Sequence, residues 1–250
     1  MAVDQHGQMF DMPVTEPLLV TPSGAEITGF RSEGDAALRW WERLRQAHPE
    51  SGLWPLLMEA DTPEYLVDPY PHATVAESLA QAHTLNGAEL LAEDGERELR
   101  GYPPDYAATI RAELAGAGAW PEEPERPGFG LPHGGGQPEK VVVALVPAAA
   151  PWLVPVTLHY GGWNKYPAPA QHAAIMRYWH HRYGAEPVVW TGTTIQYAVA
   201  RPPAVRLDAL ALAWEYRRYN DGEYDLYRAD SLTDLAASLL DAPVWRMWWD

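Results

Sequence analysis

The sequence contains no cysteine among its 250 residues. That absence excludes disulfide bonds, thiolate nucleophiles and cysteine-ligated metal sites, and it fits a reducing compartment. Basic side chains are also few, with 18 Lys and Arg against 34 Asp and Glu and a formal charge of -16. So acidic a chain disfavours contact with nucleic-acid phosphates and attracts basic partners, although net negative charge also serves solubility.

Long apolar runs and targeting signals are missing as well. The apolar segment 140–156 is interrupted by proline and is too short for a membrane-spanning helix. Residues 1–8 have neither the basic segment nor the apolar core of a signal peptide. We therefore expect a cytoplasmic protein that does not contact membranes.

Phenylalanine is scarce too, with 3 residues against 12 Trp and 13 Tyr. A chain of this length can bury a substantial core. Because Trp and Tyr carry an N–H or O–H group that needs a partner when buried, we expect rings whose polar ends are hydrogen-bonded, some of them half-buried at edges and clefts.

The first half of the chain mixes helix and strand signals. Residues 1–12 show no periodicity, and we expect them to be disordered. Residues 13–115 predict a smaller N-terminal α/β subdomain. Its expected elements are a strand at 27–30, a helix at 37–48, a strand at 53–58, a loop at 61–72, a helix from Thr74 to about 86 with capping-box spacing to Glu77, and a helix at 105–115. The charged segment 89–100 predicts no clear element.

Residues 116–139 are the clearest discontinuity in the chain. They are rich in Pro and Gly and have no apolar period, which predicts a linker or a long surface loop. The glycines do not make a P-loop or a dinucleotide fingerprint, because no strand precedes them, no helix follows and no Gly-Lys-Ser/Thr occurs. We expect no cofactor there.

The C-terminal part, residues 140–250, predicts a more regular α+β domain. Its expected elements are strands at 141–146 and 153–159, a helix at 171–183, a hairpin of 187–190 with 195–199, helices at 206–219 and after Ser231, and a strand at 244–250. In that last strand Trp245, Met247 and Trp249 share one side, and burial within the sheet is favoured over an exposed docking surface. Strands and helices interleave irregularly, so the fold class is α+β with a mixed, mostly antiparallel sheet and packed helices.

Several segments of this part carry a family resemblance. They are Gly161-Gly-Trp-Asn164 with Pro167, Trp179-His-His-Arg-Tyr-Gly-Ala-Glu-Pro187, the helix around 209–213, and the ending Pro-Val-Trp through Trp-Trp-Asp250. Together they resemble the bacterial family known as domain of unknown function 4253. The likeness is strongest from about Val141 to Asp250, and 36–57 resembles the more variable N-terminal part of longer members.

The resemblance implies a fold and a domain name but no known reaction. The family pattern often has a Cys where Tyr166 stands, and a Cys-Pro-Asp-like segment where this chain has Tyr219-Asn-Asp-Gly222. Because this chain lacks both, the resemblance argues against a shared cysteine-dependent activity. It transfers no catalytic residue.

The stretch 158–187 is the best candidate for a functional surface, since Trp, Tyr and His are dense in it. Trp163 and Asn164 follow two glycines and could place an indole and an amide at a ligand. The alternative is that Asn164 bonds within its own loop while Trp163 fills the core. The candidate binding residues are His159, Gly162, Trp163, Asn164, His172, Trp179, His180 and Glu186.

The histidines of this stretch do not have the spacing of a metal site. Zinc sites on a helix favour two His four residues apart. His172 and His180 are eight residues apart, which turns them about 80° from each other on an α-helix. We therefore expect no metal, and helix-end or core contacts for these rings instead.

Catalytic motifs are absent as well. The sequence has no Gly-x-Ser-x-Gly nucleophile elbow and no Ser-x-x-Lys pattern. Nothing in the spacing pairs the carboxylates of Glu186, Glu215, Asp221, Asp225 and Asp250 for acid/base work. The first hypothesis is therefore a non-catalytic binding or interaction protein, immunity-like or regulatory, with an aromatic and His-lined cleft for a basic protein partner or a small molecule. The alternative is a small-molecule hydrolase with His159 or His172 as base and Trp163 or Asn164 orienting the substrate.

Overall fold

The computed structural model describes residues 2–3, 9–22, 24–59, 61–66, 73–130, 140–164, 166–220 and 226–249. Its centre is one seven-stranded sheet with the order β3-β4-β6-β5-β7-β8-β9. The strands are β3 (Glu16–Val20), β4 (Glu26–Glu33), β5 (Leu53–Met58), β6 (Lys140–Pro147), β7 (Ala185–Trp190), β8 (Thr194–Val199) and β9 (Val244–Trp248). Only β5 and β7 pair in parallel, so the predicted α+β class with a mixed, mostly antiparallel sheet is confirmed.

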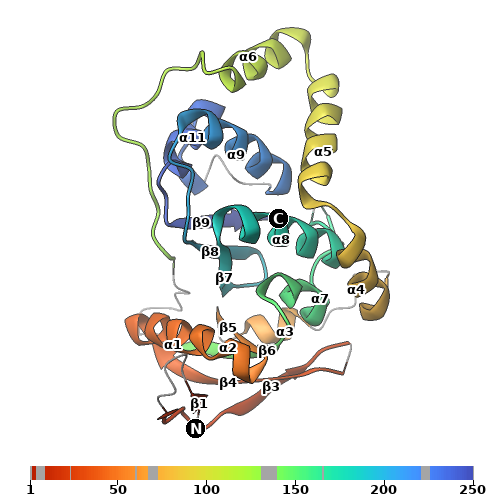
Figure 1. Cartoon of the computed structure of the whole chain (residues 1–250), viewed down its shortest axis with the longest axis vertical. Coiled ribbons are helices and arrows are strands. Elements are labelled where there is room, and N and C mark those ends of the chain that lie inside the picture. Colours follow the sequence, from red (N-terminus) through yellow and green to blue (C-terminus); the bar gives the residue numbers. More distant parts are fainter. Residues whose placement is uncertain are drawn as a thin grey trace.

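Helices surround this sheet. They are α1 (Gly34–Gln46), α2 (His48–Ser51), α3 (Thr62–Tyr65), α4 (Val75–Thr84), α5 (Gly87–Gly101), α6 (Pro104–Leu114), α7 (Val154–Leu158), α8 (Pro169–Tyr183), α9 (Arg206–Tyr219) and α11 (Leu232–Leu239). Figure 1 shows the strands stacked along the long axis, with α1 beside the lower strands and α9 and α11 above β9. Helix α5 then rises from α4 to α6 along one side.

Strands from both halves of the chain share the sheet. β6 opens the predicted C-terminal domain, yet it lies between β4 and β5 of the predicted N-terminal subdomain. Residues 140–145 of β6 pair with β4 and residues 142–147 with β5, so both edges of the strand are taken by N-terminal strands. The division at 116–139 stays a prediction, while the hydrogen-bonded sheet runs across it.

Most locally patterned elements are confirmed. The Thr74 side chain accepts from the Glu77 amide while the Glu77 carboxylate accepts from the Thr74 amide, which is the predicted capping box. Ser231 caps α11 by accepting from the Asp234 amide. Trp245, Met247 and Trp249 are buried at the end of the chain, as expected, but burial within the sheet is wrong for the strand as a whole: β9 is an edge strand, and Arg246 and Trp248 on its other side are only partly buried.

The strand predicted at 153–159 is wrong. This segment forms a short 3-10 helix, Pro151–Leu153, followed by α7. Proline is tolerated in the first turn of a helix because the amide there has no intrahelical partner, and both helices carry Pro at that position. Within the predicted loop at 61–72, Thr62–Tyr65 forms α3, and 67–72 lies outside the described residues.

In three further segments the structure has a helix or strand that the sequence did not predict. The charged segment 89–100 lies in α5, whose buried residues include Leu91 and Leu99. β3 was not predicted at all. In the segment predicted to be disordered, Ala2–Val3 (β1) pairs antiparallel with Met9–Phe10 (β2), and residues 1 and 4–8 lie outside the described ones.

The described part of the Pro- and Gly-rich segment lies on the C-terminal helices and β8. The Arg206 guanidinium stands over the Trp120 ring at 4.8 Å. The Gly130 amide donates to the Gln196 side chain at 2.9 Å, and that side chain donates back to the Gly130 carbonyl at 2.7 Å. Residues 131–139 are not described. Figure 1 shows the described residues after α6 running down past α11, on the side of the molecule opposite α5.

Candidate functional site

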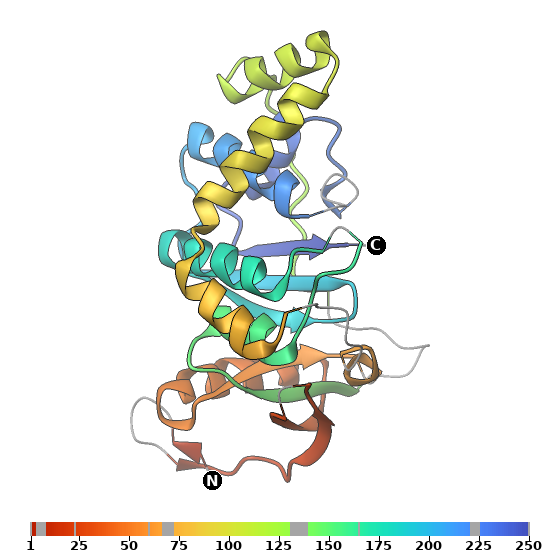
Figure 2. The same ribbon diagram turned by 90° about the vertical axis from the view of Figure 1, so that its right-hand side faces the viewer.

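Helix α8 carries most of the predicted site. The Gln171 side chain accepts from the Ala168 amide at the start of the helix, Pro169 stands in the first turn, and Gly184 ends the helix in a left-handed conformation. The helix packs against α4, α5, α7 and β7. Figure 2 shows α4 alongside α8, with the strands behind it. The surroundings of α8 therefore decide which of its side chains can meet a ligand.

The first turn of α8 places His172 inside an aromatic cluster. Its ring is fully buried, with the Tyr160, Tyr219 and Trp249 rings at 5.5, 5.3 and 5.5 Å. His172 Nδ1 lies 2.6 Å from the Tyr219 hydroxyl, whose oxygen is 3.4 Å from that of Tyr197. Burial lowers the pKa of His172 to about 3, because the charged ring would lose its hydration. His172 is therefore a neutral core residue at physiological pH.

The Gly-Gly-Trp-Asn loop is folded back onto this cluster. Gly161 has φ +108°, and a Cβ there would lie 2.1 Å from the Pro167 carbonyl oxygen and 2.9 Å from His172 Cδ2. This position therefore needs glycine both for its backbone and for the close approach. The Trp163 ring packs on the Tyr160 and Tyr166 rings at 5.1 and 4.2 Å.

The remaining loop candidates lie on the outside. Gly162 is exposed, and its amide donates to the Pro167 carbonyl at 3.0 Å. Asn164 is also exposed, with φ +46°. Lys165 lies outside the described residues. Asn164 is therefore the member of this loop whose side chain is most open to solvent.

Two more candidates have structural partners. His159 is buried, ends α7 in a left-handed conformation, and its Nε2 lies 2.9 Å from the Ala73 carbonyl oxygen. Trp179 is fully buried and donates to the Glu215 carboxylate at 2.9 Å. Tyr178 donates to the same carboxylate at 2.7 Å, and desolvation raises the pKa of Glu215. These contacts join α7 to the segment before α4, and α8 to α9.

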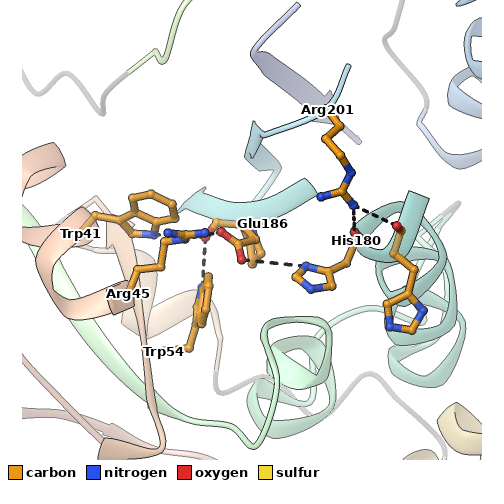
Figure 3. Close-up of polar contacts among 8 residues, drawn as sticks. Trp41, Arg45, Trp54, His180, Glu186 and Arg201 are labelled. Carbon is orange, nitrogen blue, oxygen red and sulfur yellow. Dashed lines mark hydrogen bonds and ion pairs between the residues drawn. The ribbon is translucent and has the colours of Figure 1, made fainter. Parts of the chain in front are cut away.

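His180 and Glu186 do come together, at the end of α8 and the start of β7 (Figure 3). His180 Nδ1 lies 4.0 Å from a Glu186 oxygen, and the other oxygen accepts from Arg45 of α1. Beside them the Trp41 and Trp54 indoles donate to the Pro187 carbonyl at 3.2 and 3.1 Å. Burial lowers the pKa of His180 more than the nearby carboxylate raises it.

This network attaches α1 and β5 of the N-terminal half to β7. Arg45 and the two indoles were not among the predicted site residues, since they lie 141, 146 and 133 residues from their partners. No local spacing could have paired them.

An open cavity of about 570 Å³ lies on the other side of α8, facing the turn between α4 and α5. Residues 83–87 line it from the turn. From α8 it is lined by Ala174, Arg177, Tyr178, His181 and Arg182. None of the eight predicted binding residues lines this cavity, although its α8 half belongs to the same stretch, 158–187.

Within the described part of the chain, no group of three or more His, Asp or Glu side chains is arranged to hold a metal ion. Of the carboxylates considered from the sequence, Asp221, Asp225 and Asp250 lie outside the described residues. Glu215 and Glu186 are engaged by the side chains above. None of the helices in the described ranges combines the length and the apolar character that a membrane crossing needs.

Residues 142–250 match the model of the family described as domain of unknown function (DUF4253). These residues form a DUF4253 domain. The DUF4253 domain starts in β6, ends after β9 and contains the whole of α8. It therefore supplies one wall of the cavity, while the α4–α5 turn that supplies the other wall precedes it. Neither the curated proteins nor the solved structures yield a match to this chain.

Proposed function

We propose that the protein is a non-catalytic binding protein and that its ligand site is the cavity between α8 and the α4–α5 turn. The observation that carries this proposal is the cavity itself, about 570 Å³ in volume. Small-molecule sites have volumes of about 300–1,000 Å³, with a few polar groups that converge on the ligand. Polar side chains of His83, Arg177 and His181 converge in this way.

The contacts of the aromatic and histidine residues that the sequence suggested as a ligand cleft support a structural role for them. A general base must reach the proton it removes and needs a pKa near the working pH. His172 is fully buried with a pKa of about 3, and His159 is buried against the Ala73 carbonyl. These facts weigh against the hydrolase hypothesis, which depended on these two rings.

Contacts within the protein also hold the walls of the cavity in place, as a preformed ligand site requires. Its floor is the contact between α5 and α8, and one wall is fixed by Arg177, which donates to the Ala82 and Leu85 carbonyls at 2.8 and 2.6 Å. Those two carbonyls belong to the last turn of α4 and its end, where no helical amide follows to bond them. A wall held by a guanidinium clamp keeps its shape without a ligand.

The test is a thermal-shift screen of metabolites against the wild-type protein and a variant with the cavity filled, Thr84→Trp. Thr84 is exposed and lines the cavity, so an indole there should occupy the site without disturbing the core. Thr109→Trp on α6 is the matched control, because Thr109 is also an exposed helical threonine whose hydroxyl bonds a backbone carbonyl.

We expect at least one compound to raise the melting temperature of the wild type and of Thr109→Trp but not of Thr84→Trp. A ligand at about a hundred times its dissociation constant adds about 2.7 kcal/mol to the free energy of unfolding. The proposal is wrong if no compound acts on the wild type, or if every active compound acts equally on Thr84→Trp.

A further inference from the structure

The cavity between α8 and the α4–α5 turn has a lining of unusual charge for this chain. The protein has 34 acidic and 18 basic side chains, yet the lining holds two arginines and two histidines and no Asp or Glu. From α8 it includes Arg177, His181 and Arg182, and from the turn His83. The side-chain charge of this lining is therefore positive, whereas the net charge of the whole protein is negative.

We propose that this cavity binds a small molecule through an anionic group, a phosphate or a carboxylate; the inference rests on the proposed function and names the ligand class of the same site. A guanidinium offers five N–H donors in a planar fork that matches both kinds of oxyanion. Hydrogen bonds between charged partners are also about twice as strong as neutral ones.

The two arginines retain donors for such a ligand. Arg177 uses one hydrogen of each terminal nitrogen on the Ala82 and Leu85 carbonyls, which fixes the guanidinium in place at the cavity wall. Arg182 donates to the Tyr178 hydroxyl at 2.7 Å and lies 3.8 Å from an Asp208 oxygen, with a side chain 40% exposed. Neither set of contacts uses all five donors of its guanidinium.

The histidines add donors that the described chain does not use. His83 and His181 are both exposed, and no hydrogen bond from either ring nitrogen to another described residue is present. A neutral imidazole can still donate through one nitrogen, so these rings contribute to anion binding without a change of protonation. The two residues line the cavity from different walls, and the His181 ring also lies edge-on to the Trp152 and His180 rings at 5.3 and 5.9 Å.

The carboxylates nearest to the lining are already engaged. Glu89 accepts from the Asn86 side chain at 2.9 Å, and Glu215 accepts from Tyr178 and Trp179. Asp208 lies beside Arg182 from the α9 side. The amides at the start of α5 are also capped, by Asn86, so the proposed site depends on side chains and not on the helix terminus.

Close packing of α5 on α8 gives the site its floor. A Cβ on Gly87 would lie 2.4 Å from the Ala174 carbonyl oxygen, so only glycine lets the start of α5 approach α8 so closely. This contact brings the His83 wall and the Arg177 wall into one cavity. The DUF4253 domain alone, which begins at residue 142, contains only the α8 wall.

The experiment compares anions with matched neutral compounds by calorimetric titration of the full chain. The probes are ribose 5-phosphate against ribose, and succinate against succinamide, with inorganic phosphate as a minimal anion. We expect at least one anion to bind at least about tenfold more tightly than its neutral partner, and the binding to weaken as ionic strength rises. Thr84→Trp should abolish it.

Two variants locate the anionic contact. His181→Phe, which keeps a ring but removes both ring nitrogens, and Arg182→Gln, which removes the charge, should each weaken binding of the preferred anion by about tenfold, the worth of one charge-assisted hydrogen bond. Arg31→Gln is the matched control, because Arg31 is likewise exposed and lies 4.0 Å from a single carboxylate, on β4. The His181 ring makes no hydrogen bond to another described residue, and Phe can keep its edge contacts with the Trp152 and His180 rings, so this variant keeps the test valid should Arg182→Gln lower the stability.

The outcomes separate the two proposals. If neutral compounds bind as tightly as the anions and Thr84→Trp blocks both, the binding function stands and the anionic ligand class is wrong. If no probe binds, or if Thr84→Trp and His181→Phe leave anion binding unchanged, the anionic site is wrong. In that case the thermal-shift screen of metabolites decides the binding function independently.

Discussion

His172 and His181 lie nine residues apart on one helix and in opposite surroundings. His172 has no exposed surface and bonds the Tyr219 hydroxyl, whereas His181 is exposed and lines the cavity. The difference comes from what packs on each end of α8. Aromatic residues of the Gly-Gly-Trp-Asn loop, α9 and the chain end enclose the first turn, and the second half faces the turn between two other helices. Residue type alone therefore says little about function in this stretch.

The largest expected effect concerns the enclosed end. Gly161→Ala adds a methyl group 2.1 Å from the Pro167 carbonyl oxygen at φ +108°. Backbone strain of about 1–3 kcal/mol and overpacking of about 1–3 kcal/mol should together lower the free energy of unfolding by about 2–6 kcal/mol. Urea unfolding measures this loss.

Gly24→Ala is the control for that substitution. Gly24 has φ +80°, but a Cβ added there would meet no atom within 4 Å. It therefore isolates the backbone cost, which we expect to be about 1 kcal/mol. Equal losses for the two variants would show that the Gly-Gly-Trp-Asn loop is not tightly packed against His172.

Next in size is the loss from truncating the two histidines. His172→Ala empties a ring-sized volume in the core and leaves the Tyr219 hydroxyl without its closest partner, so it should cost about 3 kcal/mol. His181→Ala loses only the edge contacts of an exposed ring with the Trp152 and His180 rings, so it should lower the free energy of unfolding by no more than about 1 kcal/mol. Chemical denaturation of both variants tests the contrast, and comparable losses would contradict it.

Acid titration should sharpen the same comparison. Burial lowers the pKa of His172 to about 3 from an ordinary value of 6.5. Between these values the unfolded state binds more protons at this residue, so its contribution to stability is full above pH 6.5 and is lost as the pH falls toward 3. The slope reaches at most about 1.4 kcal/mol per pH unit. In His172→Phe this part of the slope should vanish, and a wild-type slope in that variant would assign it to other groups.

Local periodicity predicted the enclosed end of α8 well. On a helix His172 shares a stripe with Ile175, Met176 and Trp179, and all of these are buried. The same logic failed at 153–159, because an apolar run with Pro in it fits an edge strand and a first helical turn equally. Apolar pattern alone does not separate the two when the element is only five residues long.

Contacts between distant segments could not be predicted. The strand signals at 53–58 and 141–146 were clear, but nothing in them indicates that β6 inserts between β4 and β5. The cavity likewise needs residues 83–87 beside α8, and that pairing depends on Gly87 and Ala174, which are unremarkable small residues in a single sequence. Spacing identifies faces of elements, whereas tertiary packing selects their partners.

The smallest expected effect lies where α8 ends beside β7. Glu186 holds Arg45 of the N-terminal helix and faces His180, and its side chain is only 13% exposed. Glu186→Gln keeps the shape of the side chain but removes its charge, and we expect a loss of about 1–2 kcal/mol in the free energy of unfolding.

Glu16→Gln is the matched control. Glu16 pairs with Arg31 at 4.0 Å with 61% of its side chain exposed, and such exposed pairs contribute about 0–1 kcal/mol. A loss at Glu186 no larger than at Glu16 would mean that the Trp41 indole on the Pro187 carbonyl, and not the ion pair, attaches α1 to the DUF4253 domain. In that case Trp41→Phe, which removes this donor, should cost more than Glu186→Gln.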